Sequence, residues 1–234
     1  MLNHLKNFFL QQELSPHLFS FFIPSYFLSR SLYISIRSYS NFLSGNLLDV
    51  GCGNKPFSHL FNTTQYIGLE ISDNVDSSAD YFYDGVKMPF SDNSIDSVFS
   101  SEVLEHVYDV DHYLSEIHRV LKNDSYFLLT TPYLWEIHGA PMDYRRFTNY
   151  GLVSLFESYG FKIVSHTLCC SGIDVVFQTL SNYIYRISDS NLFLRFFGLF
   201  LVFFCNLIGF ILTPFFPKNN LMYLGNVFLL KKIA

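Results

Sequence analysis

The chain has 234 residues, a length that suits one well-packed α/β domain with an appended element. A formal net charge of −5 provides no excess of basic residues for a nucleic acid, so we expect no nucleic-acid partner. The four cysteines show neither C-x-x-C spacing nor a secreted disulfide pattern. We therefore expect no metal and a cytoplasmic location, and the N-terminus does not resemble a signal peptide.

The first 44 residues are rich in aromatic side chains and only weakly patterned. The segment 26–42 can form a helix that exposes Arg30 and Arg37. We expect residues 1–44 to be an N-terminal helical or lid segment, and residues 45–234 to form the main domain.

Strand and helix patterns alternate from residue 46 onward. The predicted strands cover 47–50, 66–70, 79–83, 95–100, 126–131, 161–168 and 222–230. A short helix is expected at 56–61 and an amphipathic helix at 110–121, and a further helix begins after Thr148 and ends at Gly160. This alternation predicts right-handed βαβ units. The fold class is therefore α/β, a doubly wound, Rossmann-like sheet of seven strands with an apolar helical insertion before the last strand.

The most informative motif is an apolar strand that ends in Asp49-Val50-Gly51-Cys52-Gly53. Glycine tolerates positive φ and has no Cβ, so a ligand can lie directly on the backbone there. The acidic side chain favours a ligand that carries a positive group. A dinucleotide pyrophosphate would instead need a third glycine and a helix N-terminus, and Asn54-Lys55-Pro56 follow here. The loop therefore suits a nucleoside with a cationic tail.

Three further acidic positions lie where strands of such a sheet end. Glu70 follows the first strand by about twenty residues, where doubly wound sheets place the acid that holds a ribose. Asp84-Gly85 closes the third strand, where the exocyclic amine of adenine would need an acceptor. Glu102 lies in the loop after the fourth strand, which borders the reversal in strand order. We interpret the nearby Glu105 as a helix-start charge and His106 as a structural residue.

Together these motifs resemble a class I S-adenosylmethionine-dependent methyltransferase of the type 11 domain family. The matching residues are Asp49–Gly53, Gly68-Leu69-Glu70, Asp84 with Met88-Pro89-Phe90, Asp96, Glu102–Val107 and Glu116–Lys122. The resemblance implies S-adenosylmethionine as cofactor, held by Asp49, Gly51, Cys52, Gly53, Glu70, Asp84, Gly85 and Glu102. In one departure, Asn123-Asp124-Ser125 replaces the usual Pro-Gly-Gly turn, a change that turn-forming residues tolerate.

The loop at 131–148 is the densest polar and aromatic loop of the chain. His138 is a candidate general base, because an imidazole titrates near neutral pH, and Asp143 could orient it. Alternatively, Arg145 pairs with Asp143 and only pins the loop. The residues expected to bind the acceptor are Tyr133, Tyr144, Arg145 and Arg146.

The pattern His-Gly-x-Pro-x-Asp-Tyr-x-Arg-Phe-Thr in this loop resembles a methyltransferase subgroup associated with surface-glycan gene clusters. That resemblance implies a hydroxyl of a glycan or lipid-linked saccharide as methyl acceptor. A small lipophilic acceptor, similar to a quinone or a lipid, is the alternative. Two hypotheses of another class are an NAD-dependent oxidoreductase, which Asp49 and the missing third glycine disfavour, and a non-catalytic membrane-bound scaffold. The retained acids at 49, 70 and 84 disfavour the scaffold.

Residues 173–216 are mostly apolar, and 196–213 is long enough to span a membrane. If 222–230 joins the sheet, a single crossing would leave that strand on the far side. We therefore expect a helix or helical hairpin that enters one leaflet or covers the acceptor groove, with peripheral membrane contact through 193–216 at the inner face of the membrane. The alternatives are a buried core helix and a spanning helix.

Overall fold

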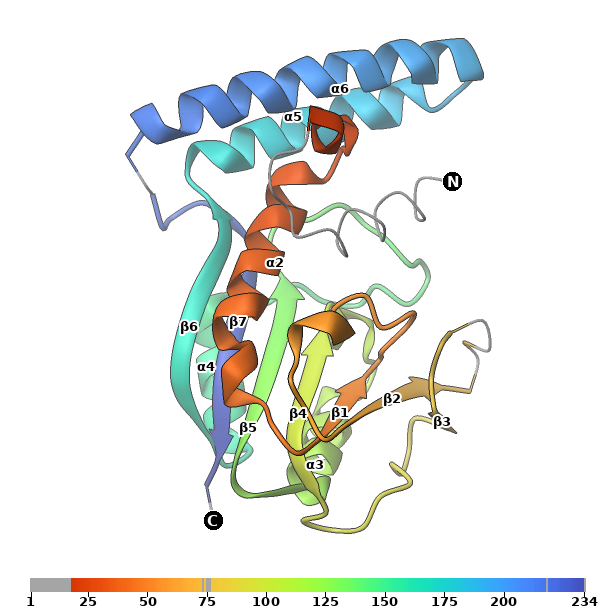
Figure 1. Ribbon diagram of the computed structural model, residues 1–234, viewed down its shortest axis with the longest axis vertical. Helices are drawn as coiled ribbons and strands as arrows, with labels where there is room; N and C mark the ends of the chain where they lie inside the picture. The colour runs from red at the N-terminus through yellow and green to blue at the C-terminus, as the bar shows by residue number, and fades with distance from the viewer. Residues whose placement is uncertain (1–17, 73, 75–76, 218, 234) are drawn as a thin grey trace. The chain divides into compact units, whose positions relative to one another are not determined.

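The computed structural model describes residues 18–233 except 73, 75, 76 and 218 (Figure 1). Its residues group into two compact units, one formed by the chain up to Ile34 together with Leu168–Leu224, and the other by Ser35–Thr167 together with the chain from Gly225. The predicted segment 1–44 is thus divided between the units, and its residues 1–17 lie outside the described residues.

One sheet of seven strands in the order β3-β2-β1-β4-β5-β7-β6 confirms the predicted fold class. The strands are β1 (Asn46–Val50), β2 (Gln65–Ile71), β3 (Tyr81–Tyr83), β4 (Ile95–Ser101), β5 (Leu121–Pro132), β6 (Phe161–Ser171) and β7 (Tyr223–Lys232). Strands β1 to β5 pair in parallel, and β7 pairs antiparallel to β5. The strand order reverses between β1 and β4, the position where open α/β sheets bind ligands.

Two local expectations differ from the structure. The fifth strand begins at Leu121 rather than 126, and the predicted turn at 123–125 is a register irregularity within it, with Asp124 at φ +62. The expected helix at 56–61 is a turn followed by the short 3-10 helix η3 (Ser58–Leu60). A single turn cannot bury an amphipathic face, so the apolar residues of this segment pack as a loop instead.

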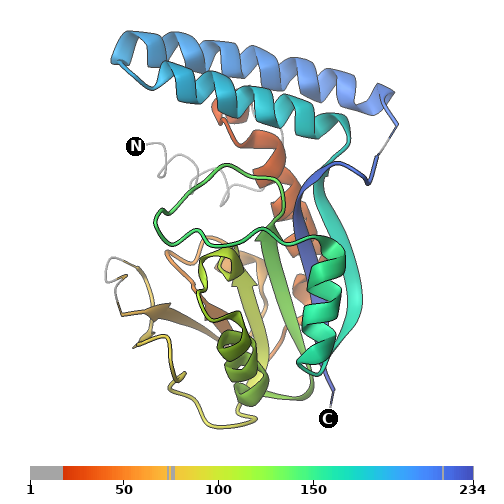
Figure 2. The same ribbon diagram turned by 180° about the vertical axis from the view of Figure 1, so that it is seen from behind.

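Helices α3 (Val110–Val120) and α4 (Asn149–Ser158) cover one face of the sheet (Figure 2). Thr148 caps α4 as predicted, because its side chain accepts a hydrogen bond from the Gly151 N–H at 3.1 Å. Gly160 follows the helix at φ +75, the left-handed conformation that glycine adopts at low cost. The side chains of Leu114, Ile117, Val120, Leu152 and Phe156 on these helices are fully buried in the core, and burial of each large side chain contributes about 1.5–3 kcal/mol.

The helical unit contains η1 (Leu18–Phe22), the first part of α2 (Tyr26–Tyr39), α5 (Ile173–Ser188), α6 (Leu192–Leu212) and η5 (Thr213–Phe215). Helices α5 and α6 form the predicted hairpin (Figure 1). Glycine makes the close approach possible at one end, because a Cβ on Gly198 would lie 1.9 Å from Ser188 Oγ. Arg37 is exposed as expected, whereas Arg30 is half-buried.

A buried polar network lies on the inner side of α6. Asn206 accepts a hydrogen bond from Ser181 Oγ at 2.7 Å and donates to the carbonyls of Phe21 and Ile23 at 2.8 and 3.0 Å. All of these groups are satisfied, and a satisfied buried network favours one specific packing arrangement. The inner side of the hairpin is therefore a folded protein core rather than a uniformly apolar surface.

Candidate active site

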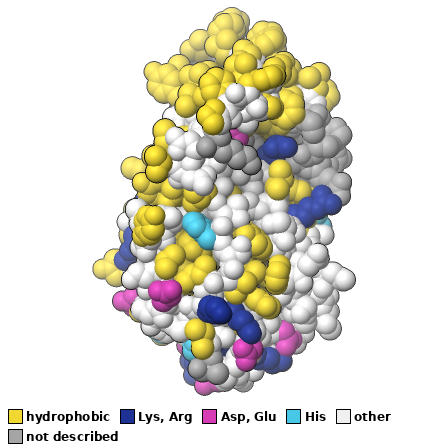
Figure 3. Space-filling model, turned by 90° about the vertical axis from the view of Figure 1, so that its left-hand side faces the viewer, with side chains coloured by type: hydrophobic (Ala, Val, Ile, Leu, Met, Phe, Trp, Pro, Cys, Tyr) yellow, Lys and Arg dark blue, Asp and Glu magenta, His cyan; other side chains and the backbone are white. Residues whose placement is uncertain are grey.

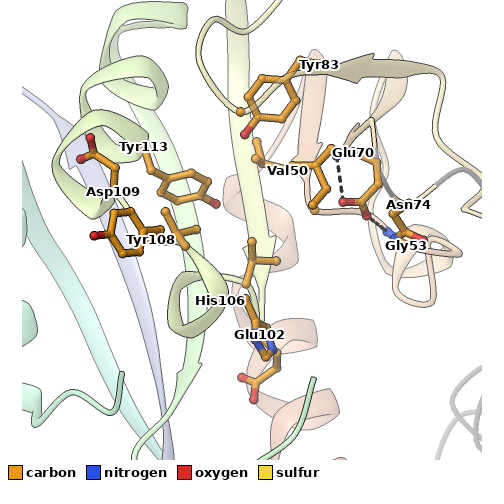
Figure 4. A pocket seen from close by; sticks show the side chains of 15 residues that line it. Val50, Gly53, Glu70, Asn74, Tyr83, Glu102, His106, Tyr108, Asp109 and Tyr113 are labelled. Atoms are coloured by element: carbon orange, nitrogen blue, oxygen red, sulfur yellow. Dashed lines mark hydrogen bonds between the residues drawn. The ribbon is translucent and has the colours of Figure 1, made fainter. Parts of the chain in front are cut away.

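A cavity of about 510 Å³ opens at the carboxyl ends of β1, β2 and β4 (Figure 4). Its volume lies within the range of small-molecule sites, and it coincides with the reversal in strand order. The residues that border it are Val50, Gly51, Gly53, Glu70, Ile71, Asn74, Tyr83, Gly85, Glu102, Val103, His106, Val107, Tyr108, Asp109 and Tyr113. Of the eight predicted cofactor-binding residues, five belong to this set.

The loop after β1 presents bare backbone to the cavity. Gly51 and Gly53 have φ values of +74 and +49. A Cβ on Gly51 would lie 2.4 Å from Val103, so this position leaves no room for a side chain. A Cβ on Gly53 would meet no described atom within 4 Å. The loop therefore offers a flat platform on which a ligand can rest, as expected from its two glycines.

Asp49 and Cys52 do not belong to the described residues that border the cavity. Asp49 is buried and accepts a hydrogen bond from Tyr66 Oη at 2.5 Å. Burial raises the pKa of Asp49 to about 7, although the Tyr66 hydroxyl lowers it. Burial likewise raises the pKa of the Cys52 thiol to about 12. The predicted contacts of these two residues with the cofactor stay predictions.

Glu70 is held at the end of β2 by two backbone donors. Its Oε2 accepts from the Gly53 N–H at 3.1 Å and its Oε1 from the Ile71 N–H at 3.0 Å (Figure 4). Each carboxylate oxygen keeps acceptor capacity beyond these bonds. A buried carboxylate fixed in this way, beside open backbone, can accept two adjacent hydroxyl groups of a ribose.

Asp84 performs a local role in the structure. Its Oδ1 accepts from the backbone N–H groups of Val86 and Lys87 at 2.9 and 3.4 Å, and these bonds hold the pKa of its carboxyl below the usual value. The exposed carboxylate is not among the described groups that border the cavity, whereas its neighbours Tyr83 and Gly85 are. The predicted contact between Asp84 and adenine stays a prediction.

Glu102 borders the cavity from the loop after β4, beside His106 (Figure 4). Its φ of +56 is rare for a side chain of this size. Thr130 compensates, because its Oγ1 donates to Glu102 Oε1 at 2.9 Å and its carbonyl accepts the Glu102 N–H at 3.1 Å. The polar end of β5 therefore fixes the orientation of this carboxylate.

Asp143 pairs with Arg146, and not with Arg145 as the alternative interpretation supposed. Both terminal nitrogens of Arg146 contact the carboxylate of Asp143, one of them at 2.7 Å. This contact holds the pKa of Asp143 far below its usual range. Asp143 also accepts the His138 backbone N–H at 3.0 Å, but its Oδ2 lies 3.7 Å from His138 Nδ1. Asp143 therefore anchors the loop backbone and does not hydrogen-bond the imidazole ring.

The other expected acceptor-binding residues also hold the loop. Arg145 donates to the carbonyls of Val107 and Tyr108 at 2.5 and 2.9 Å. Tyr144 donates its backbone N–H to the Glu105 carbonyl at 3.0 Å, and its ring lies edge-on to Tyr108 with centroids 5.4 Å apart. Arg145 borders a second hollow of about 390 Å³, whereas Tyr133 is not among the described residues that border either cavity.

Sequence reasoning underrated two residues next to His138. Glu105 is fully buried, and its Oε1 lies 3.5 Å from His138 Nε2. His106 borders the cavity, with its Nε2 3.1 Å from the same nitrogen. Glu105, rather than Asp143, is the main cause that raises the pKa of His138 above its usual value. The adjacent Glu-His pair directly after a strand was the signal that could have identified this cluster.

Residues 48–129 match the family model described as a methyltransferase domain. No curated protein matches the sequence. Phosphoethanolamine N-methyltransferase 2 of Haemonchus contortus, solved with S-adenosyl-L-methionine, is 18% identical with a TM-score of 0.57, covering 97% of this chain and 57% of that chain. The [4+2]-cyclase SpnF is 18% identical with a TM-score of 0.55, covering 88% and 82%. The putative methyltransferase solved with the Haloferax volcanii Trm112 activator is 21% identical with a TM-score of 0.51, covering 60% and 72%.

These structural similarities show the fold, and the presence of a cyclase among them shows that the fold alone does not determine the reaction. The domain match adds the activity, because it covers the β1 loop, Glu70 and the loop after β4. The protein is therefore an enzyme with a methyltransferase domain, and its cofactor is S-adenosylmethionine.

Replacement of the cavity carboxylate tests the cofactor site. Glu70→Gln keeps the shape of the side chain but removes the charge that strengthens hydrogen bonds from hydroxyl donors. We expect the Kd for S-adenosylhomocysteine, measured by calorimetry, to rise at least about tenfold, equivalent to about 1.4 kcal/mol. The exposed Glu157→Gln on α4 is the control and should bind as wild type does. Equal affinities of the Glu70→Gln protein and wild type for S-adenosylhomocysteine would show that Glu70 does not bind the cofactor.

The buried carboxyl of Asp49 makes stability depend on pH. Its folded-state pKa of about 7 exceeds the ordinary 3.8, so between these values the folded protein keeps a proton that the unfolded chain has released. The contribution of Asp49 to the free energy of unfolding should therefore fall as pH rises from about 4 to about 7. In urea unfolding we expect the free energy of wild type minus that of Asp49→Asn to decrease across this range, while the exposed control Asp92→Asn keeps the wild-type slope. Parallel profiles would contradict the pKa shift.

Proposed function

Because the protein is an S-adenosylmethionine-dependent methyltransferase, we propose that it methylates a hydroxyl group of a glycan or lipid-linked saccharide. The observation that carries this proposal is a pair of imidazoles, of which His106 borders the cofactor cavity and His138 lies beside it, with 3.1 Å between the two Nε2 atoms. A hydroxyl must lose its proton as the methyl group is transferred, whereas a neutral amine attacks with its own lone pair. Imidazoles beside the cavity suit a hydroxyl acceptor, because they can accept that proton.

The cavity residues fit the cofactor in shape and chemistry. Glu70 would accept from the ribose hydroxyls, the Gly51–Gly53 backbone would support the methionine part, and Tyr83 and Gly85 would border the adenine. The bound cofactor supplies the methyl group on a sulfonium centre. Burial of most of a ligand in such a cavity aligns the acceptor with the methyl carbon, and alignment of this kind provides a large part of the rate.

The second hollow supports a saccharide rather than a quinone-like acceptor. Its walls include Asp109, Asp111 and Arg145 together with the aromatic rings of Tyr108 and Phe147. Charged groups bind sugar hydroxyls, while an aromatic ring can pack against the apolar face of a sugar. Tyr108 and Asp109 border both hollows, so an acceptor bound in the second can extend into the first. A fully lipophilic acceptor would remove water from these charged groups without offering them any polar contact.

The α5–α6 hairpin supports a peripheral membrane contact through 193–216, at the cytoplasmic face of the membrane. Within the described residues, Leu192–Phe215 is the one helical segment long and apolar enough to cross a bilayer, with a mean hydropathy of 2.4 and 28% of its most apolar window buried. Hydrophobic side chains gather over this hairpin (Figure 3). The exposed members include Leu192, Phe193, Phe196, Phe197, Phe200, Leu201, Phe204, Ile208, Ile211 and Phe215. Apolar surface on this scale is typical of an interaction site.

Connectivity favours a hairpin lying in the interface over a spanning helix. The hairpin connects β6 to β7, and both strands belong to one sheet. Helix α5 has 16 residues, which extend about 24 Å and fall short of the ~30 Å hydrocarbon core. Two crossings are therefore unavailable, and one crossing would separate β7 from its sheet. An amphipathic hairpin with its apolar side in one leaflet avoids both problems.

The acceptor proposal is tested on the products of living cells. We expect glycans or glycolipids from cells that lack the gene to be lighter than wild type by the mass of one methylene group per modified residue, in mass spectrometry of both fractions. Return of the wild-type gene should restore the mass, and return of the Glu70→Gln gene should restore less of it. A mass difference confined to proteins or to non-glycosylated lipids would contradict a saccharide acceptor.

The membrane contact is tested by sedimentation with phosphatidylglycerol-phosphatidylethanolamine vesicles. We expect the full chain to pellet with the vesicles. A triple variant, with Phe193→Ser, Phe196→Ser and Phe200→Ser, should have a partition coefficient at least about 100-fold lower, because burial of each ring contributes about 1.5–3 kcal/mol. The matched control combines Phe82→Ser, Tyr150→Ser and Val164→Ser, which are exposed apolar residues of the sheet-containing unit. Equal sedimentation of both triple variants would contradict the proposal.

A further inference from the structure

Three potential ligand atoms converge at a cluster of Glu105, His106 and His138, of which His106 borders the cofactor cavity. Glu105 and His106 belong to η4 (Leu104–His106), in the loop after β4, and His138 lies in the loop after β5. The two Nε2 atoms are 3.1 Å apart, and Glu105 Oε1 lies 3.5 Å from that of His138 and 3.8 Å from that of His106. Loops that are distant in sequence thus bring one carboxylate oxygen and two imidazole nitrogens into a single triangle.

The hydrogen bonds of the two rings determine which nitrogens carry protons. His106 Nδ1 lies 2.6 Å from the Met142 carbonyl and His138 Nδ1 lies 3.2 Å from the Glu136 carbonyl. A carbonyl oxygen only accepts, so each Nδ1 is the donor and each neutral ring keeps a lone pair on Nε2. Arg146 also approaches His138 Nδ1, at the longer distance of 3.5 Å. The two Nε2 lone pairs therefore face each other.

The third atom of the triangle, Glu105 Oε1, is also an acceptor without a donor in the described part of the chain. Glu105 is fully buried, and its Oε1 finds no hydrogen-bond donor among the residues that the structure describes. Its Oε2 is the oxygen that contacts Thr131 Oγ1, at 3.4 Å. A buried carboxylate oxygen without a donor costs free energy unless a cation is near it. Three acceptors thus surround a position that suits a cation.

We propose that Glu105, His106 and His138 bind one divalent first-row transition-metal ion. Bonds of about 2.0–2.2 Å to such an ion place neighbouring ligand atoms about 3.0–3.6 Å apart, close to the three distances observed. Two imidazoles and one carboxylate form a known ligand set that leaves other coordination positions open. The carbonyls of Met142 and Glu136 then act as outer partners, which orient ligating imidazoles in metal sites.

Gly139 permits this arrangement. A Cβ at this position would lie 3.0 Å from His106 Cε1, and the residue has φ +65. The loop that carries His138 can therefore close over His106 only with glycine here. His106 and His138 keep 27% and 29% of their side chains exposed, so an ion can enter from the cavity.

The ion would replace the imidazoles as the means of activating a hydroxyl for methyl transfer, and this step rests on the proposed function. A divalent ion lowers the pKa of a hydroxyl group bound beside it. The carbon–oxygen bond then forms as the carbon–sulfur bond of the cofactor breaks, and the hydroxyl proton passes to water. In this arrangement His138 acts as a ligand rather than as the base. We expected no metal because the sequence lacks paired cysteines. A site of two histidines and one carboxylate needs no cysteine, so that expectation does not apply to it.

Direct binding of cobalt tests the site without any acceptor. We expect the chelator-treated full chain to bind one Co²⁺, measured by calorimetry and by the visible absorption of the ion. His138→Ala and His106→Ala should each weaken binding at least about 100-fold, beyond the effect of losing an outer partner. The exposed His59→Ala is the matched control and should bind as wild type does. An unchanged midpoint of urea unfolding shows that each variant is folded.

Two results would overturn the metal proposal. One is no binding of Co²⁺ or Zn²⁺ to wild type, which would indicate that a proton on one imidazole satisfies the triangle. The other is equal binding by the His138→Ala and His59→Ala proteins, which would place the ion elsewhere. Methylation of a saccharide hydroxyl is a separate measurement, so a bound ion without any saccharide methylation would reject the proposed function and leave the metal site standing.

Discussion

The central strand β1 pairs in parallel with β2 on one side and β4 on the other, and the site depends on this arrangement. Leu48 lies opposite Ile67 of β2 and Val98 of β4. Parallel strands end at the same edge of a sheet, so the loops that follow all three strands meet there. The glycine platform, Glu70 and the Glu102–His106 segment come from these loops. No one of them could form a cofactor site alone, and the register of β1 brings them together.

The sequence predicts the scaffold well because its signals are local. The G-x-G loop, the strand order implied by alternation and the capping Thr148 each depend on residues close together in the chain, and the structure confirms the fold and the cap. The direction of side chains is harder to predict. Asp49 lies in the expected motif, but its buried carboxyl accepts a hydrogen bond from Tyr66, a partner on the neighbouring strand that spacing along the chain does not indicate.

The partners in the loop after β5 could not be derived from spacing. Arg145 and Arg146 are adjacent and chemically equivalent in the sequence, yet Arg146 binds Asp143 while Arg145 reaches the carbonyls of residues 107 and 108. That choice depends on how the loop folds over the segment after β4. Glu105 was underrated for a related reason. An acid at the start of a short helix is normally a solvated charge, and only the tertiary structure reveals that it is fully buried beside two imidazoles.

The insertion of the hairpin between β6 and β7 has a consequence for how such an enzyme can diversify. The chain leaves β6 at Gly172 and returns to β7 from Met222, and these two residues are joined by a hydrogen bond of 2.9 Å between the Gly172 N–H and the Met222 carbonyl. The entry and exit points of the insertion are therefore clamped together regardless of its length. Helical turns can be added or removed at the far end of the hairpin without altering strand register. The length of the hairpin and the catalytic chemistry can therefore change independently.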